Sequence, residues 1–282
     1  MLGSMLAAML VEMSERGPDS AGVAIYCESS DSKTSKLTLH SSDSEFDWDS
    51  VHQQLLDATG SDVQLRVRAS HAVISTDAPL QSIRQWLEMN CPELQVMSAG
   101  SSIEIYKEKG LPREFVERFS VQDFQGTHAL GHTRMATESA VTTQHSHPFS
   151  TGMDLCLVHN GSLSNHNRLR EQLQNQGIDF QTDNDSEVAA GYLMWQMQQG
   201  ASLKQALEQA ILDLDGFYTF AVGTRDGFAV LRDPIACKPA VMAETEDWVA
   251  MASEFRAIAQ LPGVDQASIW EPAPATVYSW GG

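Results

Sequence analysis

The order of helix-like and strand-like segments constrains the fold of this chain most strongly. Predicted strands follow one another in runs, and groups of helices separate the runs. For example, residues 165–214 are predicted to form helices and residues 217–252 to form strands. A parallel α/β sheet would instead alternate single strands with single helices. Residues 2–13 show the three- and four-residue apolar spacing of an amphipathic helix. The order predicts an α+β fold of antiparallel sheets with helices packed outside them.

One region interrupts this order. Residues 28–126 have predicted strands and helices of their own, which makes them longer than a simple connection. We expect them to form a small α/β unit inserted between two strands of the main sheet, within a single domain of residues 1–282. A chain of 282 residues is compatible with one domain that carries such an insertion.

Composition excludes several classes of function. The formal net charge is -19, and so acidic a surface repels phosphate backbones, so we expect no nucleic-acid partner. No apolar run reaches the roughly 18 residues of a membrane span, and the first residues lack the pattern of a signal peptide. We therefore expect a cytoplasmic protein without a membrane partner. The four cysteines are far apart and are expected to be reduced thiols.

Four segments place glycine beside polar or charged residues where an apolar strand ends or a helix begins, and such positions often carry reactive groups. They are residues 16–22, 131–137, 159–161 and 182–188. The first is also compatible with a simple Gly-Pro turn. In the second, Arg134 presents a planar guanidinium that matches a carboxylate, although an internal salt bridge is the alternative.

The other two segments suggest complementary roles. Asn160 and Gly161 can together donate to one oxyanion, although Asn-Gly is also common in tight turns. Asp185 can accept hydrogen bonds from a substrate ammonium, although Asp185 or Ser186 could instead cap the following helix. Together with Arg134, these residues predict a site for a zwitterionic amino acid. The four segments contain no obvious nucleophile.

At these residues the sequence resembles the class II glutamine amidotransferases, a family whose nucleophile is an N-terminal cysteine. The motifs keep the family's order and spacing outside residues 28–126. They are RGPDSAG (16–22), GHTRMAT (131–137), HSHPF (145–149), VHNG (158–161), NDSEV (184–188), LDGFYTFAV (214–222), RDPIACKP (232–239) and ASE (252–254). Within the family, the chain is most similar to the stand-alone subunit of glutamate-synthase-like and N-methylglutamate-synthase-like systems.

The resemblance implies a four-layer αββα N-terminal-nucleophile hydrolase sandwich. It implies hydrolysis of L-glutamine to glutamate without a cofactor, with the ammonia passed to a synthase-type partner subunit. It assigns Arg134, Thr137 and Asp185 to glutamine binding, and Asn160 and Gly161 to the oxyanion. We expect the loop that carries His147 to pack on the site, and we predict His147 to be a substrate-binding residue.

The sequence departs from the family at its start. Family members begin with Cys-Gly-Ile and a core strand, whereas this sequence begins within the helix that normally follows. About 15 residues are expected to be missing, through a misplaced start site or a genuine truncation. None of the four cysteines has a free amine, so we expect the chain to be inactive. We also expect an unpaired sheet position and an exposed apolar stripe on the first helix.

Two other functions are compatible with the sequence. The chain could bind glutamine or glutamate without turnover and serve as an assembly subunit of a synthase complex. Alternatively, His132, His145, His147 and His159 lie close enough in sequence to suggest a zinc hydrolase. Because the motifs already explain these histidines, we expect no metal site.

Overall fold

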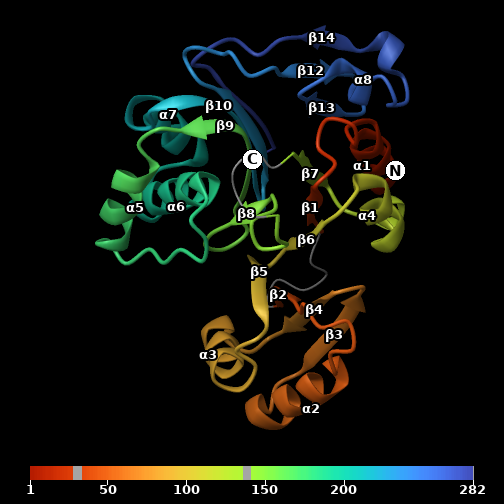
Figure 1. Ribbon diagram of the computed structural model, residues 1–282, viewed down its shortest axis with the longest axis vertical. Coiled ribbons are helices and arrows are strands. Elements are labelled where there is room, and N and C mark those ends of the chain that lie inside the picture. Colours follow the sequence, from red (N-terminus) through yellow and green to blue (C-terminus); the bar gives the residue numbers. More distant parts are fainter. Residues whose placement is uncertain (28–33, 136–140, 282) are drawn as a thin grey trace.

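The structure is a computed structural model that describes residues 1–27, 34–135 and 141–281. Two antiparallel sheets face each other, and helices cover the outer face of each (Figure 1). One sheet has the order β6-β1-β7 and the other the order β15-β11-β10-β9-β8. The chain therefore forms the predicted α+β architecture with four layers.

In the described part of the chain, the two facing sheets contain seven strands at positions predicted from the sequence and one short strand, β8, that was not predicted. The three-stranded sheet comprises β1 (Ser20–Tyr26), β6 (Ile103–Lys109) and β7 (His128–Arg134). The five-stranded sheet comprises β8 (Phe149–Ser150), β9 (Cys156–Leu163), β10 (Gly216–Thr224), β11 (Gly227–Arg232) and β15 (Val277–Gly281).

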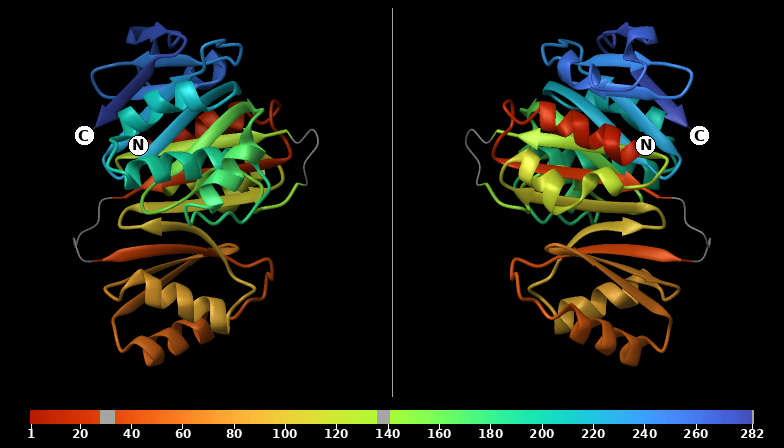
Figure 2. Two further views of the ribbon diagram at one scale, coloured as in Figure 1. Left: turned by 90° about the vertical axis from the view of Figure 1, so that its left-hand side faces the viewer. Right: turned by 90° about the vertical axis from the view of Figure 1, so that its right-hand side faces the viewer.

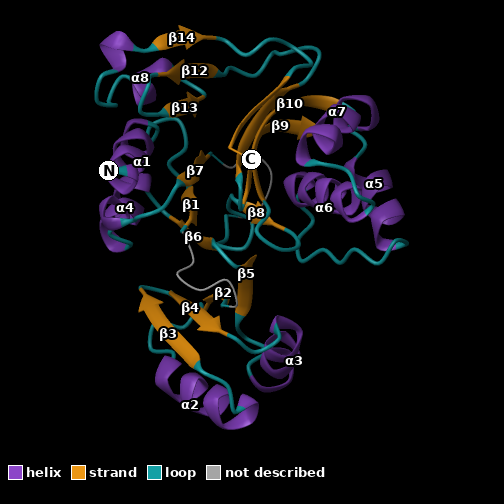
Figure 3. Cartoon of the chain, turned by 180° about the vertical axis from the view of Figure 1, so that it is seen from behind, coloured by secondary structure: helices purple, strands orange, loops and turns teal. Residues whose placement is uncertain are grey.

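Helices enclose this pair of sheets on both sides, as the view from behind also shows (Figure 3). The three-stranded sheet is covered by α1 (Leu2–Glu12), α4 (Pro112–Arg118) and the short 3-10 helix η1 (Val121–Asp123). The five-stranded sheet is covered by α5 (His166–Gln174), α6 (Asp185–Gln198) and α7 (Leu203–Asp213).

Strand β1 explains why the sheets lie between helices. All seven of its residues are buried, and successive side chains of a strand point to opposite faces. Val23 and Ile25 pack in the cluster formed with α1 and α4, whereas Ala24 and Tyr26 pack in the cluster between the two sheets. Because β1 has an apolar core on each side, its residues 21–25 are all apolar and do not alternate with polar residues.

Two smaller units complete the chain. The C-terminal part of the chain forms a third sheet of β12 (Val241–Glu244), β13 (Val249–Ala252) and β14 (Ser268–Trp270). The short helices α8 (Phe255–Ile258) and η2 (Val264–Gln266) lie between β13 and β14 in sequence. The inserted unit has the strand order β3-β4-β2-β5. It contains β2 (Ser35–His40), α2 (Trp48–Thr59), β3 (Val63–Arg68), β4 (His71–Thr76), α3 (Leu80–Asn90) and β5 (Gln95–Gly100).

The predicted region 28–126 is divided between two parts of the molecule. Its own four-stranded sheet ends with β5, and the side views show this sheet as a separate lobe beside the main sandwich (Figure 2). Strand β6 instead pairs with β1 along its whole length, and α4 packs with α1 on the main body. Strand β4 has six residues and pairs with both β2 and β3, and it was not predicted from the sequence.

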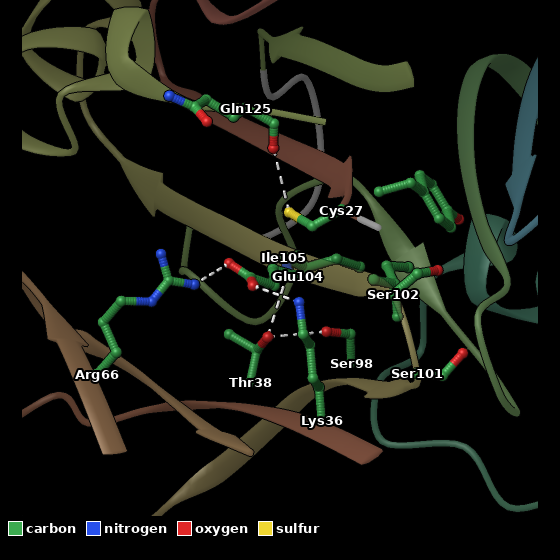
Figure 4. A network of polar contacts seen from close by, with 12 residues as sticks. Cys27, Lys36, Thr38, Arg66, Ser98, Ser101, Ser102, Glu104, Ile105 and Gln125 are labelled. Carbon is green, nitrogen blue, oxygen red and sulfur yellow. Dashed lines mark hydrogen bonds and ion pairs between the residues drawn. The ribbon is translucent and has the colours of Figure 1, made fainter. Parts of the chain in front are cut away.

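A buried carboxylate joins the inserted unit to the main sheet (Figure 4). Glu104 of β6 is 3% exposed and accepts hydrogen bonds from Lys36 of β2 at 3.0 Å and from Arg66 of β3 at 2.5 Å. Burial acts to raise the pKa of Glu104, but the two cations outweigh it and hold this pKa below its ordinary value. The ion pairs therefore compensate for the burial of this charge.

Of the two features expected at the start of the chain, the structure has the free sheet edge but not the exposed apolar stripe on α1. Within the described residues, β7 pairs with β1 and has no second partner strand, so β7 forms an edge of its sheet. The apolar stripe of α1, however, is largely covered rather than exposed. Leu6 and Leu10 are buried over β7, and Met5 and Met9 pack against the cluster around α8.

Candidate functional site

One large cavity gathers the residues that the motifs singled out. It has a volume of about 1660 Å³ and is lined by α1, β7, β9 and the start of α6. Arg134, His147, Asn160, Gly161 and Asp185 all contribute to its wall. These residues are up to 51 positions apart in sequence, since 185 minus 134 is 51. Thr137, the other predicted glutamine-binding residue, lies outside the described residues.

Arg134 lies at the end of β7, where it is partly buried. Its Nη1 donates a hydrogen bond to the carbonyl of His145 at 3.0 Å, and its own carbonyl accepts one from the amide of Asp19 at 3.0 Å. The segment 16–22 thus lies directly against β7. A Cβ on Gly17 would come within 2.5 Å of the Thr133 carbonyl carbon, which explains the glycine in that motif.

Asn160 and Gly161 lie within β9 and do not form a turn. The sequence places residues 159–161 where an apolar strand ends, but Asn160 pairs with Thr219 and Gly161 with Tyr218 of β10. Gly161 has φ 146, and a Cβ there would lie 2.0 Å from the Phe217 carbonyl oxygen. The close approach of the two strands therefore requires glycine at position 161, whatever its role in the site. Among the described residues, no hydrogen bond occupies the Asn160 side chain, which lines the cavity.

Asp185 is the first residue of α6, but it does not cap the helix. Asn184 is the cap, and its side chain accepts a hydrogen bond from the Ser186 amide at 2.8 Å. Asp185 Oδ2 instead accepts from the Leu163 amide of β9 at 2.9 Å. The Asp185 side chain remains 21% exposed, and a carboxylate has room for further donors. This tether to β9 fixes one end of the carboxylate while it faces the cavity.

Three imidazoles lie behind these groups. The rings of His132 and His147 stack with centroids 4.1 Å apart, and His132 Nε2 lies 3.2 Å from the His159 carbonyl. Ser186 Oγ lies 3.0 Å from both His147 Nε2 and His159 Nδ1. A hydroxyl has one proton, so Ser186 donates to only one of three groups, the two rings and Asp185 Oδ1 at 3.4 Å. From the sequence, Ser186 was only a possible helix cap, and this role was not predicted.

Burial keeps these imidazoles neutral. It lowers the pKa of His132 and of His159 to about 4, and that of His147 well below its ordinary value. Asp185 acts in the opposite direction on the pKa of His159 without reversing the effect. Near neutral pH, Arg134 and Asp185 therefore supply opposite charges to a cavity whose three clustered histidines are uncharged.

The thiols lie elsewhere. None of the four cysteines, all of which belong to the described residues, lines the cavity. Cys156 is fully buried and its pKa is raised to about 12 by burial, while burial raises the pKa of Cys27 to about 11. Both thiols are therefore poor nucleophiles at neutral pH.

The part of the chain that the structure describes contains no group of three or more His, Cys, Asp or Glu side chains that could hold a metal ion. It also contains no helix that is long and apolar enough to span a membrane.

Comparison with known proteins identifies the family. A profile of the glutamine amidotransferase domain matches residues 132–260, which contain Arg134, His147, Asn160, Gly161 and Asp185 of the cavity wall. The chain is 54% identical over 280 residues to the glutamine amidotransferase-like protein GlxB of Rhizobium meliloti, covering 99% of this chain and 92% of that protein. The chain belongs to the glutamine amidotransferase family.

Some other members match only part of this chain. The glutamine–fructose-6-phosphate aminotransferase of Vibrio vulnificus strain YJ016 is 31% identical over 131 residues, which are 46% of this chain and 21% of that enzyme. That match is confined to part of the chain, whereas the match to the Rhizobium meliloti protein includes the inserted unit.

Solved structures place the amidotransferase in the class II fold. The glutamine phosphoribosylpyrophosphate amidotransferase of B. subtilis aligns with a TM-score of 0.60 and 20% sequence identity. The alignment covers 99% of this chain and 46% of that one, so this chain spans about half the length of that enzyme. At this identity the likeness concerns the fold, and it confirms the predicted N-terminal-nucleophile hydrolase architecture.

Proposed function

We propose that this chain is a cytoplasmic glutamine amidotransferase subunit that binds L-glutamine in the large cavity and supplies ammonia to a synthase-type partner. The observation that carries the proposal is the convergence of Arg134, Asn160, Gly161 and Asp185 on one cavity wall. These residues come from three separate elements, and a zwitterionic substrate requires their combination of charge and hydrogen-bonding groups.

Each group has a role in this proposal. Arg134 binds the α-carboxylate and Asp185 accepts hydrogen bonds from the α-ammonium. The side-chain amide of Asn160 and the backbone amide of Gly161 stabilise the oxyanion that forms on the side-chain carbonyl. The neutral histidines behind Asp185 support this arrangement because they add no competing positive charge near the ammonium.

Hydrolysis requires a nucleophile in addition to these residues. In the mechanism that the family resemblance implies, the thiolate of an N-terminal cysteine attacks the glutamine amide carbon, and its own amine transfers the proton. Ammonia leaves, and water then hydrolyses the thioester to glutamate. Because none of the four cysteines lines the cavity, we expect a polypeptide of these 282 residues to bind glutamine without releasing ammonia.

The proposed binding is tested by calorimetric titration of the chain with L-glutamine. Arg134→Met should weaken binding by tenfold or more, the effect of losing a bidentate charged contact. Arg225→Met is the matched control, because Arg225 lines the same cavity from an exposed position and should leave the affinity unchanged. Binding that is absent in the unaltered chain, or equal in both variants, would contradict the proposal.

A second candidate is a non-catalytic glutamine-binding or assembly subunit. The position of the cysteines away from the cavity favours it. The two candidate functions are distinguished by an ammonia-release assay on a chain that is extended at its N-terminus to begin with Cys-Gly-Ile and a strand. Ammonia release by the extended chain supports the amidotransferase, and binding without release supports the assembly subunit.

A further inference from the structure

We propose that Lys107 is a positioning residue for the glutamine site, and that its buried ammonium holds the loop of residues 144–148 in the shape that supports Arg134. The inference rests on the proposed function, because it concerns the same site. Lys107 belongs to β6, outside the motifs of the sequence analysis, and does not line the large cavity. It would therefore act through the loop rather than on the substrate.

The contacts of Lys107 are concentrated on one stretch of backbone. Its side chain is buried, with the residue 5% exposed. Its Nζ donates hydrogen bonds to the carbonyls of Gln144 at 3.1 Å, Ser146 at 2.9 Å and Pro148 at 3.2 Å. The ring of Phe149 completes the surroundings, with its centroid 4.8 Å from Nζ.

This arrangement requires a cation at its centre. Three carbonyl dipoles that point at one position repel one another, and in a buried environment this repulsion is only weakly screened. An ammonium supplies three donors and a positive charge, so it satisfies all three carbonyls at once. A neutral apolar side chain of similar length would leave two buried carbonyls and one partly buried carbonyl without this donor, and we expect the loop to rearrange.

The same loop contacts the glutamine site from its other side. The carbonyl of His145 accepts the hydrogen bond from Arg134, and the imidazole of His147 contacts Ser186. Residues 145 and 147 alternate with the carbonyls of 144, 146 and 148 that bind Lys107. The loop thus presents its even-numbered carbonyls to Lys107 and its odd-numbered residues to the site.

The start of α6 is linked to Lys107 by electrostatics. Glu187 is 5% exposed and raises the pKa of Lys107, whereas burial has the larger effect and lowers that pKa to about 7. A small void of about 20 Å³ is lined by both side chains and is large enough for one water molecule. The Glu187 carboxylate also accepts from the amides of Gln181 and Thr182, just before Asp185. Below about pH 7, where its ammonium form prevails, Lys107 therefore places a positive charge between the loop of residues 144–148 and the segment that leads to Asp185.

The test compares Lys107→Met with a matched control, Lys36→Met. Lys36 of the inserted unit is also mostly buried, with a side chain 13% exposed, but it contacts Glu104 of β6 and not the loop. Each variant is titrated with L-glutamine and with L-glutaminamide, which lacks the α-carboxylate, by ligand-observed NMR at a temperature where thermal melts show it folded. Lys107→Met should weaken glutamine binding about tenfold and glutaminamide binding less than twofold, and Lys36→Met should change neither.

Several other outcomes of these titrations would overturn the inference. Equal loss for both ligands, or for both variants, would show that Lys107 acts only on stability and overturn the inference, as would unchanged glutamine binding in Lys107→Met. If the methionine variant does not fold, Lys107→Gln and Lys107→Arg are judged by the same ratio, and the arginine, which keeps the charge, should retain more glutamine affinity.

If the unaltered chain binds no glutamine, the proposed function fails by itself. Amide hydrogen exchange then decides the inference separately. The amides of 144–148 should lose protection in the Lys107 variants and keep it in Lys36→Met, and unchanged protection in both would overturn the inference.

Discussion

Asp185 combines a structural contact with a charge that faces the cavity. Its Oδ2 is held by the Leu163 amide at 2.9 Å, while its side chain remains 21% exposed. The neighbouring Asn184 performs the capping role that the sequence made equally plausible for Asp185 or Ser186. At the scale of single residues, the type of side chain was therefore predictable, but its partner depended on which strand lies against the helix.

The role of the Asp185 charge can be tested without removing its contact with β9. In Asp185→Asn the amide oxygen can still accept from the Leu163 amide, but the negative charge is lost. We expect glutamine affinity to fall about tenfold, whereas 4-carbamoylbutanoate, which lacks the α-ammonium, should bind no more weakly than before. Asp183→Asn is the control, because its side chain is 87% exposed. Equal losses for the two ligands would argue against the assignment.

The buried histidines predict an acid-sensitive fold. In the folded chain the pKa of His132 and of His159 is about 4, below the ordinary value of about 6.5. Between these values the unfolded chain binds more protons, so the free energy of unfolding falls as the pH drops from 6.5 towards 4 and is insensitive to these groups above 6.5.

This pH dependence is measured by denaturant unfolding at pH 7 and pH 5. The loss should be on the order of 2 kcal/mol for one such histidine, since a pKa unit corresponds to about 1.4 kcal/mol. His159→Gln should lose less stability over the same interval than the unaltered chain. An identical loss in the variant would mean that His159 titrates normally in the folded state.

At the scale of elements, β9 is the clearest difference between expectation and structure. The Asn-Gly pair reads as a turn, but the strand continues through it to Leu163 because β10 pairs with it residue by residue. The free edge of β7 and the packing of α1 on α8 likewise depend on which elements meet. Local sequence contains the apolar pattern of a strand but not the partner that extends it.

The junction between β6 and the inserted unit gives a prediction at this scale. Glu104→Gln leaves the mostly buried Lys36 without its anion, so we expect the free energy of unfolding to fall by about 3 kcal/mol. Arg66→Gln should cost less than about 1 kcal/mol, because the Arg66 side chain is 54% exposed. Chemical denaturation measures both. Equal effects would show that Arg66, and not the burial of Glu104, dominates the junction.

At the scale of the whole molecule, the net charge of -19 acts on every element at once. Self-repulsion among so many carboxylates opposes the compact state, and salt screens it over about 10 Å at 0.1 M. We expect the melting temperature to rise by several degrees between roughly 10 mM and 150 mM salt. Sodium, potassium and choline chlorides should act alike, and a rise with only one of these cations would indicate specific binding instead of screening.

The sequence by itself determined much of this protein. Apolar periodicity predicted most helices and strands, and the ordered motifs predicted the family, the fold and five residues that line the cavity. It did so because periodicity and motif spacing are local properties of the chain. The tertiary structure decided the rest: where the inserted sheet ends, that Asn160 and Gly161 lie in a strand, that Ser186 lies between two imidazoles, and that Lys107 reaches the loop of 144–148. Each of these is a contact between segments far apart in sequence, and which segments meet is set by the packing of buried surfaces rather than by neighbouring residues.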